Sequence, residues 1–165
     1  MMARSHVIIG LGAWVATAPG LHMPSLGPAY LALAVAGSLL PDIDHPKSWV
    51  GRRTRPVSTA IASALGHRGI THSAIAVIAL AALLLHAGYR RGGVAALAIG
   101  YLSHLAADML TPRGLRLAWP LRRTWGLPLC RADSAMEAVV VTAVAGGMAW
   151  WLLPSHFSEL AVWSR

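Results

Sequence analysis

Three of the six acidic residues in this chain lie at or inside the ends of long apolar stretches, at Asp42, Asp44 and Asp108. An ionised carboxylate in such a place is costly unless it is paired with a cation or coordinates a metal. Pro41, followed by extended backbone, would direct Asp42 and Asp44 toward one side. The three carboxylates are therefore candidate ligands of a divalent metal.

Two histidines, His67 and His72, lie in the segment Gly-His-Arg-Gly-Ile-Thr-His-Ser that introduces the next apolar stretch. On one continuous helix, residues five positions apart would point about 140° away from each other. Both can reach one ion only if His67 comes from a loop, and Gly69 makes such a bend easy. We expect His72 to begin the helix, with Thr71 or Ser73 as its cap.

His104 and Asp108 are four residues apart within an apolar stretch. This spacing places both side chains on one helix face, one turn apart, as in many metal sites. A structural ion pair between helices would satisfy the same need for a partner, and the spacing does not decide between these alternatives.

Two further residues are expected at the same level of the bundle, His6 before the first apolar stretch and Glu137 at the start of the last. Each has a simpler explanation. His6 is equally consistent with a polar residue at a membrane interface, and Glu137 with a first-turn helix residue that follows Asp133 and Ser134 as caps.

Imidazole and carboxylate ligands without thiolates suit zinc, and also manganese or iron, in a site with one or more ions. Such a site can activate water, while a neighbouring cation such as Arg68 stabilises charge that develops on a substrate. The residues thus predict a metal-assisted hydrolase with Asp44 and Arg68 as catalytic residues. The predicted metal ligands are Asp42, Asp44, His67, His72, His104, Asp108, His6 and Glu137.

The composition indicates where these residues are held. Of 165 residues, 56% are hydrophobic and only 12% are charged, and the mean hydropathy is +0.56. Six acids and fourteen bases cannot cover the exterior of a soluble domain of this size, so lipid must cover much of it. The lone cysteine, Cys130, excludes an internal disulfide and a multi-cysteine zinc site.

Five apolar stretches predict an all-α, polytopic membrane bundle of about five helices that forms a single domain over residues 1–165. With the N-terminus in the cytoplasm, eleven Lys and Arg residues lie on the inner side and three on the outer side. This bias favours a cytoplasmic N-terminus and places all the candidate motifs at the cytoplasmic boundary. The stretches cover residues 7–19, 26–40, 70–87, 94–110 and 135–153.

The first of these stretches has one alternative explanation. Arg4 precedes an apolar run that ends in Ala16-Thr17-Ala18, a pattern that also occurs in signal peptides. Pro19 directly after the would-be cleavage point argues against cleavage. We therefore expect a membrane helix.

Four segments of the chain carry a resemblance, in this order: Pro41-Asp42-Ile43-Asp44-His45, residues 67–73, Ser103-His104 to Asp108, and residues 111–114. Through them the chain resembles the YdjM family over about residues 6–120. These are multi-pass proteins of the bacterial inner membrane, some under LexA control, that are described as metal-dependent hydrolases. The pair His104 and Asp108 is also similar to the His-x-x-x-Asp pair of zinc-dependent phospholipase C and P1-type nucleases, which act on phosphoesters.

The family resemblance implies hydrolysis, and the similarity to the phospholipases and nucleases favours a phosphoester. The depth of the site at the cytoplasmic leaflet favours a lipid or lipid-linked molecule as the expected substrate. The alternative is a membrane protein without catalysis, an ion transporter or a lipid-binding scaffold, that uses the same Asp and His residues. We expect membrane lipid as a partner and no specific nucleic acid, because the basic loops lack a recognition module. The oligomeric state is left open.

Overall fold

The computed structural model describes residues 1–65, 69–121 and 123–163. Within these residues the chain is helical, and its one β-type pairing is an isolated bridge between Leu115 and Trp125. The predicted all-α class is confirmed. Each of the five apolar stretches forms a helix, namely α1 (Ala3–Thr17), α2 (Pro28–Leu39), α5 (Ala74–His86), α6 (Arg91–Met109) and α7 (Ala135–Trp163).

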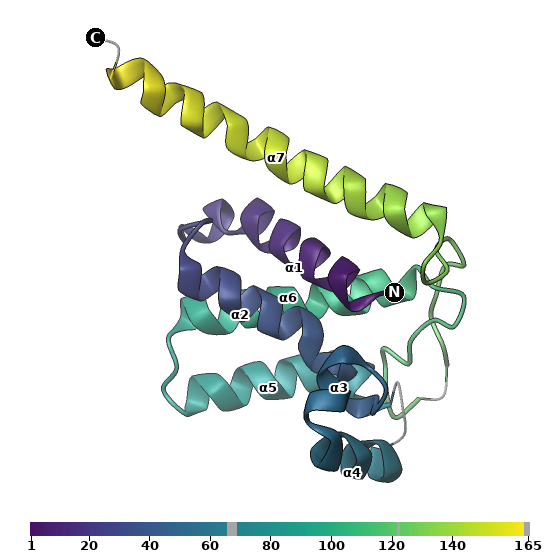
Figure 1. Cartoon of the computed structure of the whole chain (residues 1–165). Helices are drawn as coiled ribbons and strands as arrows, with labels where there is room; N and C mark the ends of the chain where they lie inside the picture. Colours follow the sequence, from purple (N-terminus) through teal and green to yellow (C-terminus); the bar gives the residue numbers. More distant parts are fainter. Residues whose placement is uncertain (66–68, 122, 164–165) are drawn as a thin grey trace.

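Helix α6 lies at the centre, in contact with α1, α2 and α5, while α7 packs along α1 (Figure 1). Helices α2 and α6 approach each other closely because glycine lies at their contact. A Cβ atom on Gly37 would lie 2.0 Å from the carbonyl oxygen of Leu97, and one on Gly100 would lie 2.0 Å from that of Ala34. Two small residues thus bring the C-terminal half of α2 against the middle of α6, about one turn before His104.

The connection between α2 and α5 contains two helices that the sequence analysis did not predict, α3 (Trp49–Arg53) and α4 (Arg55–Leu65). Ser48 caps α3, and its hydroxyl accepts a hydrogen bond from the Gly51 N–H at 2.9 Å. Both helices are short, and α4 is amphipathic rather than uniformly apolar, so a search for long apolar stretches does not find them. Three single-turn 3-10 helices complete the connections, η1 (Pro19–Leu21), η2 (Leu40–Asp44) and η3 (Ile70–His72).

One apolar cluster lies between α1, α2 and α6, where Trp14 is fully buried among alanines, and a second joins α5, α6 and the segment after α6 through Val77, Tyr101, Leu105 and Leu115. Outside these clusters, α5 and α7 expose large apolar side chains, including Ile78 at 68% and Trp150 at 75%. Of the helices in the described residues, only α7 contains a stretch that is both long and apolar enough to cross a membrane, Ala135–Leu153. Helix α5 is apolar but has 13 residues.

Candidate metal centre

His104 and Asp108 lie one turn apart on α6, as predicted, and both are buried. The Nε2 atom of His104 is 3.9 Å from Oδ2 of Asp108. On the other side of the ring, Nδ1 of His104 is 2.7 Å from the carbonyl oxygen of Ser38, near the end of α2. Because a carbonyl only accepts, Nδ1 carries the proton and Nε2 presents its lone pair to the cluster. Nε2 has no hydrogen-bond partner in the described part of the chain.

His72 reaches the same place from η3, one residue before the cap of α5. Its Nδ1 is 3.2 Å from Oδ2 of Asp44, and the Thr71 hydroxyl donates a hydrogen bond to the same oxygen. Its Nε2 is 3.9 Å from Oδ2 of Asp108. A carboxylate behind the outer nitrogen of a histidine is the usual support for a metal-binding imidazole. Ser73 caps α5 by accepting from the Ala76 N–H at 3.3 Å.

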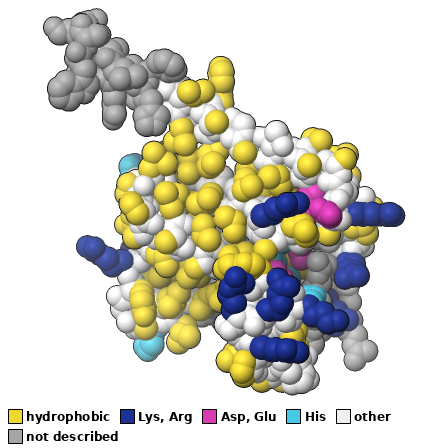
Figure 2. Space-filling model, in the orientation of Figure 1, with side chains coloured by type: hydrophobic (Ala, Val, Ile, Leu, Met, Phe, Trp, Pro, Cys, Tyr) yellow, Lys and Arg dark blue, Asp and Glu magenta, His cyan; other side chains and the backbone are white. Residues whose placement is uncertain are grey.

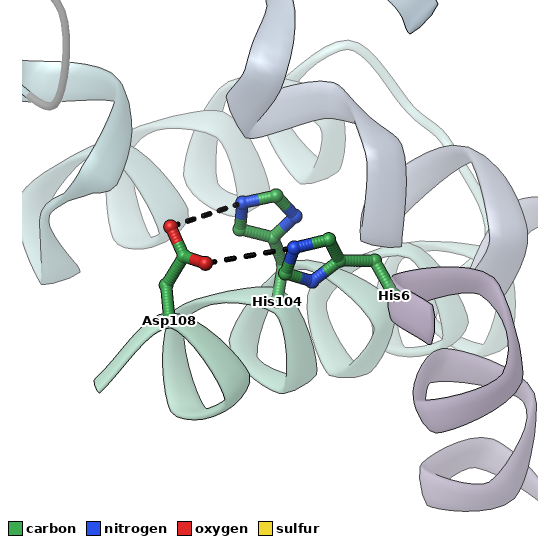
Figure 3. Close-up of side chains that lie close together, drawn as sticks. All are labelled: His6, His104 and Asp108. Atoms are coloured by element: carbon green, nitrogen blue, oxygen red, sulfur yellow. Dashed lines mark ion pairs between the residues drawn. The ribbon is translucent and has the colours of Figure 1, made fainter. Parts of the chain in front are cut away.

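His6 enters from α1 and stacks on His104, with ring centroids 3.8 Å apart and planes inclined by 14°. Figure 3 shows both rings facing the carboxylate of Asp108. Nε2 of His6 is 3.5 Å from Oδ1, the oxygen that also lies 3.3 Å from the amino nitrogen of Met1. His6 therefore lies at the same level of the bundle as the other candidate residues, as predicted, and its ring is part of the cluster.

Asp42 approaches from η2, with Oδ1 3.9 Å from Nε2 of His104. Two sets of ligand atoms each lie within 4.8 Å of one another, one from His6, His104 and Asp108 and the other from Asp42, His72 and His104. Because Nδ1 of His104 is occupied by Ser38, its ring has one nitrogen to offer, and the two sets share it. The donors and the partnerless Nε2 of His104 fit a divalent metal such as zinc.

Asp44 and Glu137 have other contacts. Asp44 is completely buried and lies on the Nδ1 side of His72, which favours a supporting role over direct ligation. The two carboxylate oxygens of Glu137 accept hydrogen bonds from the backbone N–H groups of Met2 and Asp133, at 2.7 and 2.6 Å. Glu137 thus ties the start of α1 to the start of α7 and is in neither set of ligand atoms. The predicted residues His67 and Arg68 lie outside the described residues.

A pocket of about 530 Å³ opens beside the cluster, with His6, Asp42 and Asp108 among its lining residues. Figure 2 shows Lys and Arg side chains gathered around an area where acidic and histidine atoms are visible. We call this cavity the basic pocket, after the four Lys and Arg side chains that line it in addition to the amino group of Met1, namely Arg4, Lys47, Arg52 and Arg113. From sequence these four residues indicate only membrane orientation, because no spacing rule connects residues in three separate segments.

The fold and the site together define a class of protein. It is a helical protein with an apolar exterior and a buried cluster of His and Asp residues at one end. The family model described as "YdjM inner membrane protein" matches residues 1–163, and the chain belongs to this family. It is therefore an inner-membrane protein, as predicted.

Relatives with this family name occur in Escherichia coli (strain K12) and Shigella flexneri, each named "Inner membrane protein YdjM" and 48% identical over 101 residues. The alignment covers 58% of this chain and 52% of each relative, so the chain spans about half their length. "Uncharacterized protein YvsG" of Bacillus subtilis (strain 168) is 29% identical over 144 residues, which are 87% of this chain and 88% of that protein. No solved structure matches the chain.

Proposed function

We propose that the protein is a membrane-bound, metal-dependent hydrolase that cleaves a phosphoester of a lipid or lipid-linked molecule at the cytoplasmic leaflet. The observation that carries the proposal is the buried Nε2 of His104. It has no hydrogen-bond partner among the described residues, yet it lies 3.9 Å from an oxygen of Asp108 and from one of Asp42. A buried polar atom surrounded by potential ligands at this spacing suits an ion better than a core hydrogen bond.

His72, His104 and Asp108 hold the ion in this proposal. This trio takes His72 from one set of ligand atoms and Asp108 from the other, because Nε2 of both histidines lies 3.9 Å from Oδ2 of Asp108. A tetrahedral zinc ion with bonds of about 2.0–2.2 Å places neighbouring ligand atoms roughly 3.3–3.6 Å apart. The corresponding separations to Asp108 are 3.9 Å for both histidines, so closure on an ion needs movements of a few tenths of an ångström. A bound ion would supply Lewis-acid activation of water and of the substrate.

The remaining residues have distinct roles. Asp42 lines the basic pocket and is the more accessible carboxylate, with 20% of its side chain exposed against 3% for Asp108. Its Oδ1 is therefore placed to accept a proton from the attacking water. Asp44 orients His72 through Nδ1, and His6 holds Oδ1 of Asp108. Arg68 remains the predicted contact to charge on the substrate.

The apolar helices α1, α2, α5, α6 and α7 lie in the membrane in this proposal, with the N-terminus in the cytoplasm. The four Lys and Arg side chains of the basic pocket all lie at the end that carries the cluster, which agrees with a positively charged inner side. Helices α1, α2 and α5 have 12 to 15 residues, so a locally thinned bilayer must accommodate them.

The distribution of buried polar residues favours a one-sided site over a transport path. At the cluster end lie His6, His72, His104 and Asp108, whereas the buried residues toward the opposite ends of α1 and α2 include Trp14 and other apolar side chains. A transporter would need polar groups along the whole bundle.

Metal content decides the first step of the proposal. We expect purified protein to carry zinc or another divalent ion by elemental mass spectrometry, and His104→Ala to lose most of it. His86→Ala is the control, because His86 is an exposed residue at the end of α5. Hydrolysis of bis(p-nitrophenyl) phosphate should require the ion and decline with Asp42→Asn, whose metal content should be retained. An unchanged metal content in His104→Ala would contradict the proposed site.

A further inference from the structure

The four Lys and Arg side chains of the basic pocket are of two kinds. Arg4 forms an ion pair with Asp133 at 3.4 Å. Lys47, Arg52 and Arg113 have no carboxylate within ion-pair distance among the residues that the structure describes. These three therefore leave positive charge in a cavity whose acidic residues belong to the metal cluster.

Two other arginines nearby contact aromatic rings instead of lining the basic pocket. Arg53, one residue after Arg52, lies over the Trp49 ring at 3.7 Å and donates a hydrogen bond to the Trp49 carbonyl at 2.9 Å. Arg123 likewise lies over the ring of Trp125 at 4.3 Å. Their positive charge is directed to aromatic rings, whereas the charge of Arg52 and Arg113 is directed to the pocket.

A groove between α1 and α7 begins where the basic pocket ends. Arg4 lines both the pocket and the first part of this groove, together with Ser5, Ile8 and several residues between Asp133 and Thr142. The next part, further along both helices, is lined by apolar residues, among them Ile9, Gly12, Val144 and Trp151. We call these two cavities, of about 420 and 360 Å³, the α1–α7 groove.

The charges and the gradient of polarity fit one kind of ligand. Arginine and lysine side chains bind the oxygens of a phosphate, and guanidinium groups do so with two hydrogen bonds each. A groove that is polar at the pocket and apolar further along suits a chain of hydrocarbon attached to that phosphate. In the proposed topology the apolar part of the groove would lie at membrane depth, because it runs along the apolar stretch Ala135–Leu153 of α7.

We propose that the basic pocket and the α1–α7 groove form one binding site for a phospholipid with an exposed phosphate. Lys47, Arg52 and Arg113 bind the phosphate, and the groove receives an acyl chain. This site rests on the proposed function only in that its ligand would be the substrate of the metal cluster, since its own residues bind without catalysis.

Binding of phosphatidic acid to the full chain in mild detergent, measured by native mass spectrometry, tests the proposal. Dissociation constants are compared with those for diacylglycerol, which lacks the phosphate, and for glycerol 3-phosphate, which lacks the chains. We expect phosphatidic acid to bind at least tenfold more tightly than either. Equal binding of diacylglycerol would overturn the phosphate site, and equal binding of glycerol 3-phosphate would overturn the groove.

Two matched pairs of variants locate the site. The double variant Arg52→Gln/Arg113→Gln should weaken binding of phosphatidic acid by about tenfold or more, whereas Arg53→Gln/Arg123→Gln should leave it within about twofold. Gly147→Leu should also weaken binding, because Gly147 lines the groove and open space surrounds it. Gly146→Leu is its control, since Gly146 also faces open space but does not line the groove.

If a test variant and its control weaken binding of phosphatidic acid equally in either pair, the proposal is contradicted. Metal content is measured on every variant, which separates this inference from the proposed function. Lost binding with the metal retained assigns the defect to the lipid site. Intact lipid binding without hydrolysis by the metal-loaded protein would contradict the hydrolase and leave the lipid site standing.

Discussion

The imidazole rings of His6 and His104 are stacked with centroids 3.8 Å apart, and the carboxylate of Asp108 offers a different oxygen to each. Oδ2 lies near His104 and His72, and Oδ1 lies near His6. Asp108 thus connects a histidine of α1 with one of η3 and one of its own helix. A bundle that brought α1 to a different register along α6 would lose this connection.

Asp44 and Asp108 should respond differently to loss of charge, because one supports a histidine and the other faces the ion. Asp44→Asn removes the charged partner of His72 Nδ1 and should weaken metal binding by about 10–100-fold without abolishing it. Asp108→Asn should abolish stoichiometric binding. Competition with a fluorescent zinc chelator measures both affinities. Loss of all metal from Asp44→Asn would show instead that Asp44 is itself a ligand, as the sequence suggested.

The close approach of α2 and α6 makes Gly100 sensitive to the smallest substitution. A Cβ atom there would lie 2.0 Å from the Ala34 carbonyl oxygen, so the helices must separate in Gly100→Ala. We expect a destabilisation of about 1–3 kcal/mol, seen as a lower melting temperature in detergent. Gly146→Ala is the control, because a Cβ atom on Gly146 meets nothing within 4 Å. Equal melting temperatures for the two variants would contradict the observed packing of α2 on α6.

The helices and the main ligands could be predicted from sequence because they depend on local patterns. Apolar runs indicated the five long helices, and the four-residue spacing placed His104 and Asp108 on one face. The supporting contacts depend on packing between distant segments, and no pattern reports them. Examples are the Ser38 carbonyl behind His104, the stack with His6 and the use of Glu137 by two backbone N–H groups.

The glycines show the same limit. Gly37, Gly100, Gly146 and Gly147 are all small residues within long helices, but of these four only Gly37 and Gly100 lie at a close helix contact in the structure. A small residue permits an approach, and the neighbouring helix determines whether one occurs. In α7, the two glycines face open space instead, and Gly147 lines the α1–α7 groove.

The membrane topology that we propose from the distribution of charge can be tested with single cysteines. The native Cys130 is buried, so we expect Cys130→Ser to provide a background without labelling. In this background, Lys47→Cys should react with a membrane-impermeant maleimide only from the cytoplasmic side. Tyr89→Cys, in the exposed connection between α5 and α6, should react only from the opposite side. Labelling of both positions from one side would contradict the proposed passage of α5 through the membrane.

Removal of metal should destabilise the bundle, because the cluster gathers carboxylates and histidines that an ion would hold together. Asp44 lies within ion-pair distance of His72, and Asp42 and Asp108 lie within ion-pair distance of His104, so an ion would link η2, η3 and α6. An ion present at 100 times its dissociation constant stabilises the folded state by about 2.7 kcal/mol. We therefore expect a chelator to lower the melting temperature in detergent and added zinc to restore it. His104→Ala should melt at the same temperature with and without chelator, whereas a chelator effect of equal size in this variant would place the stabilising ion elsewhere.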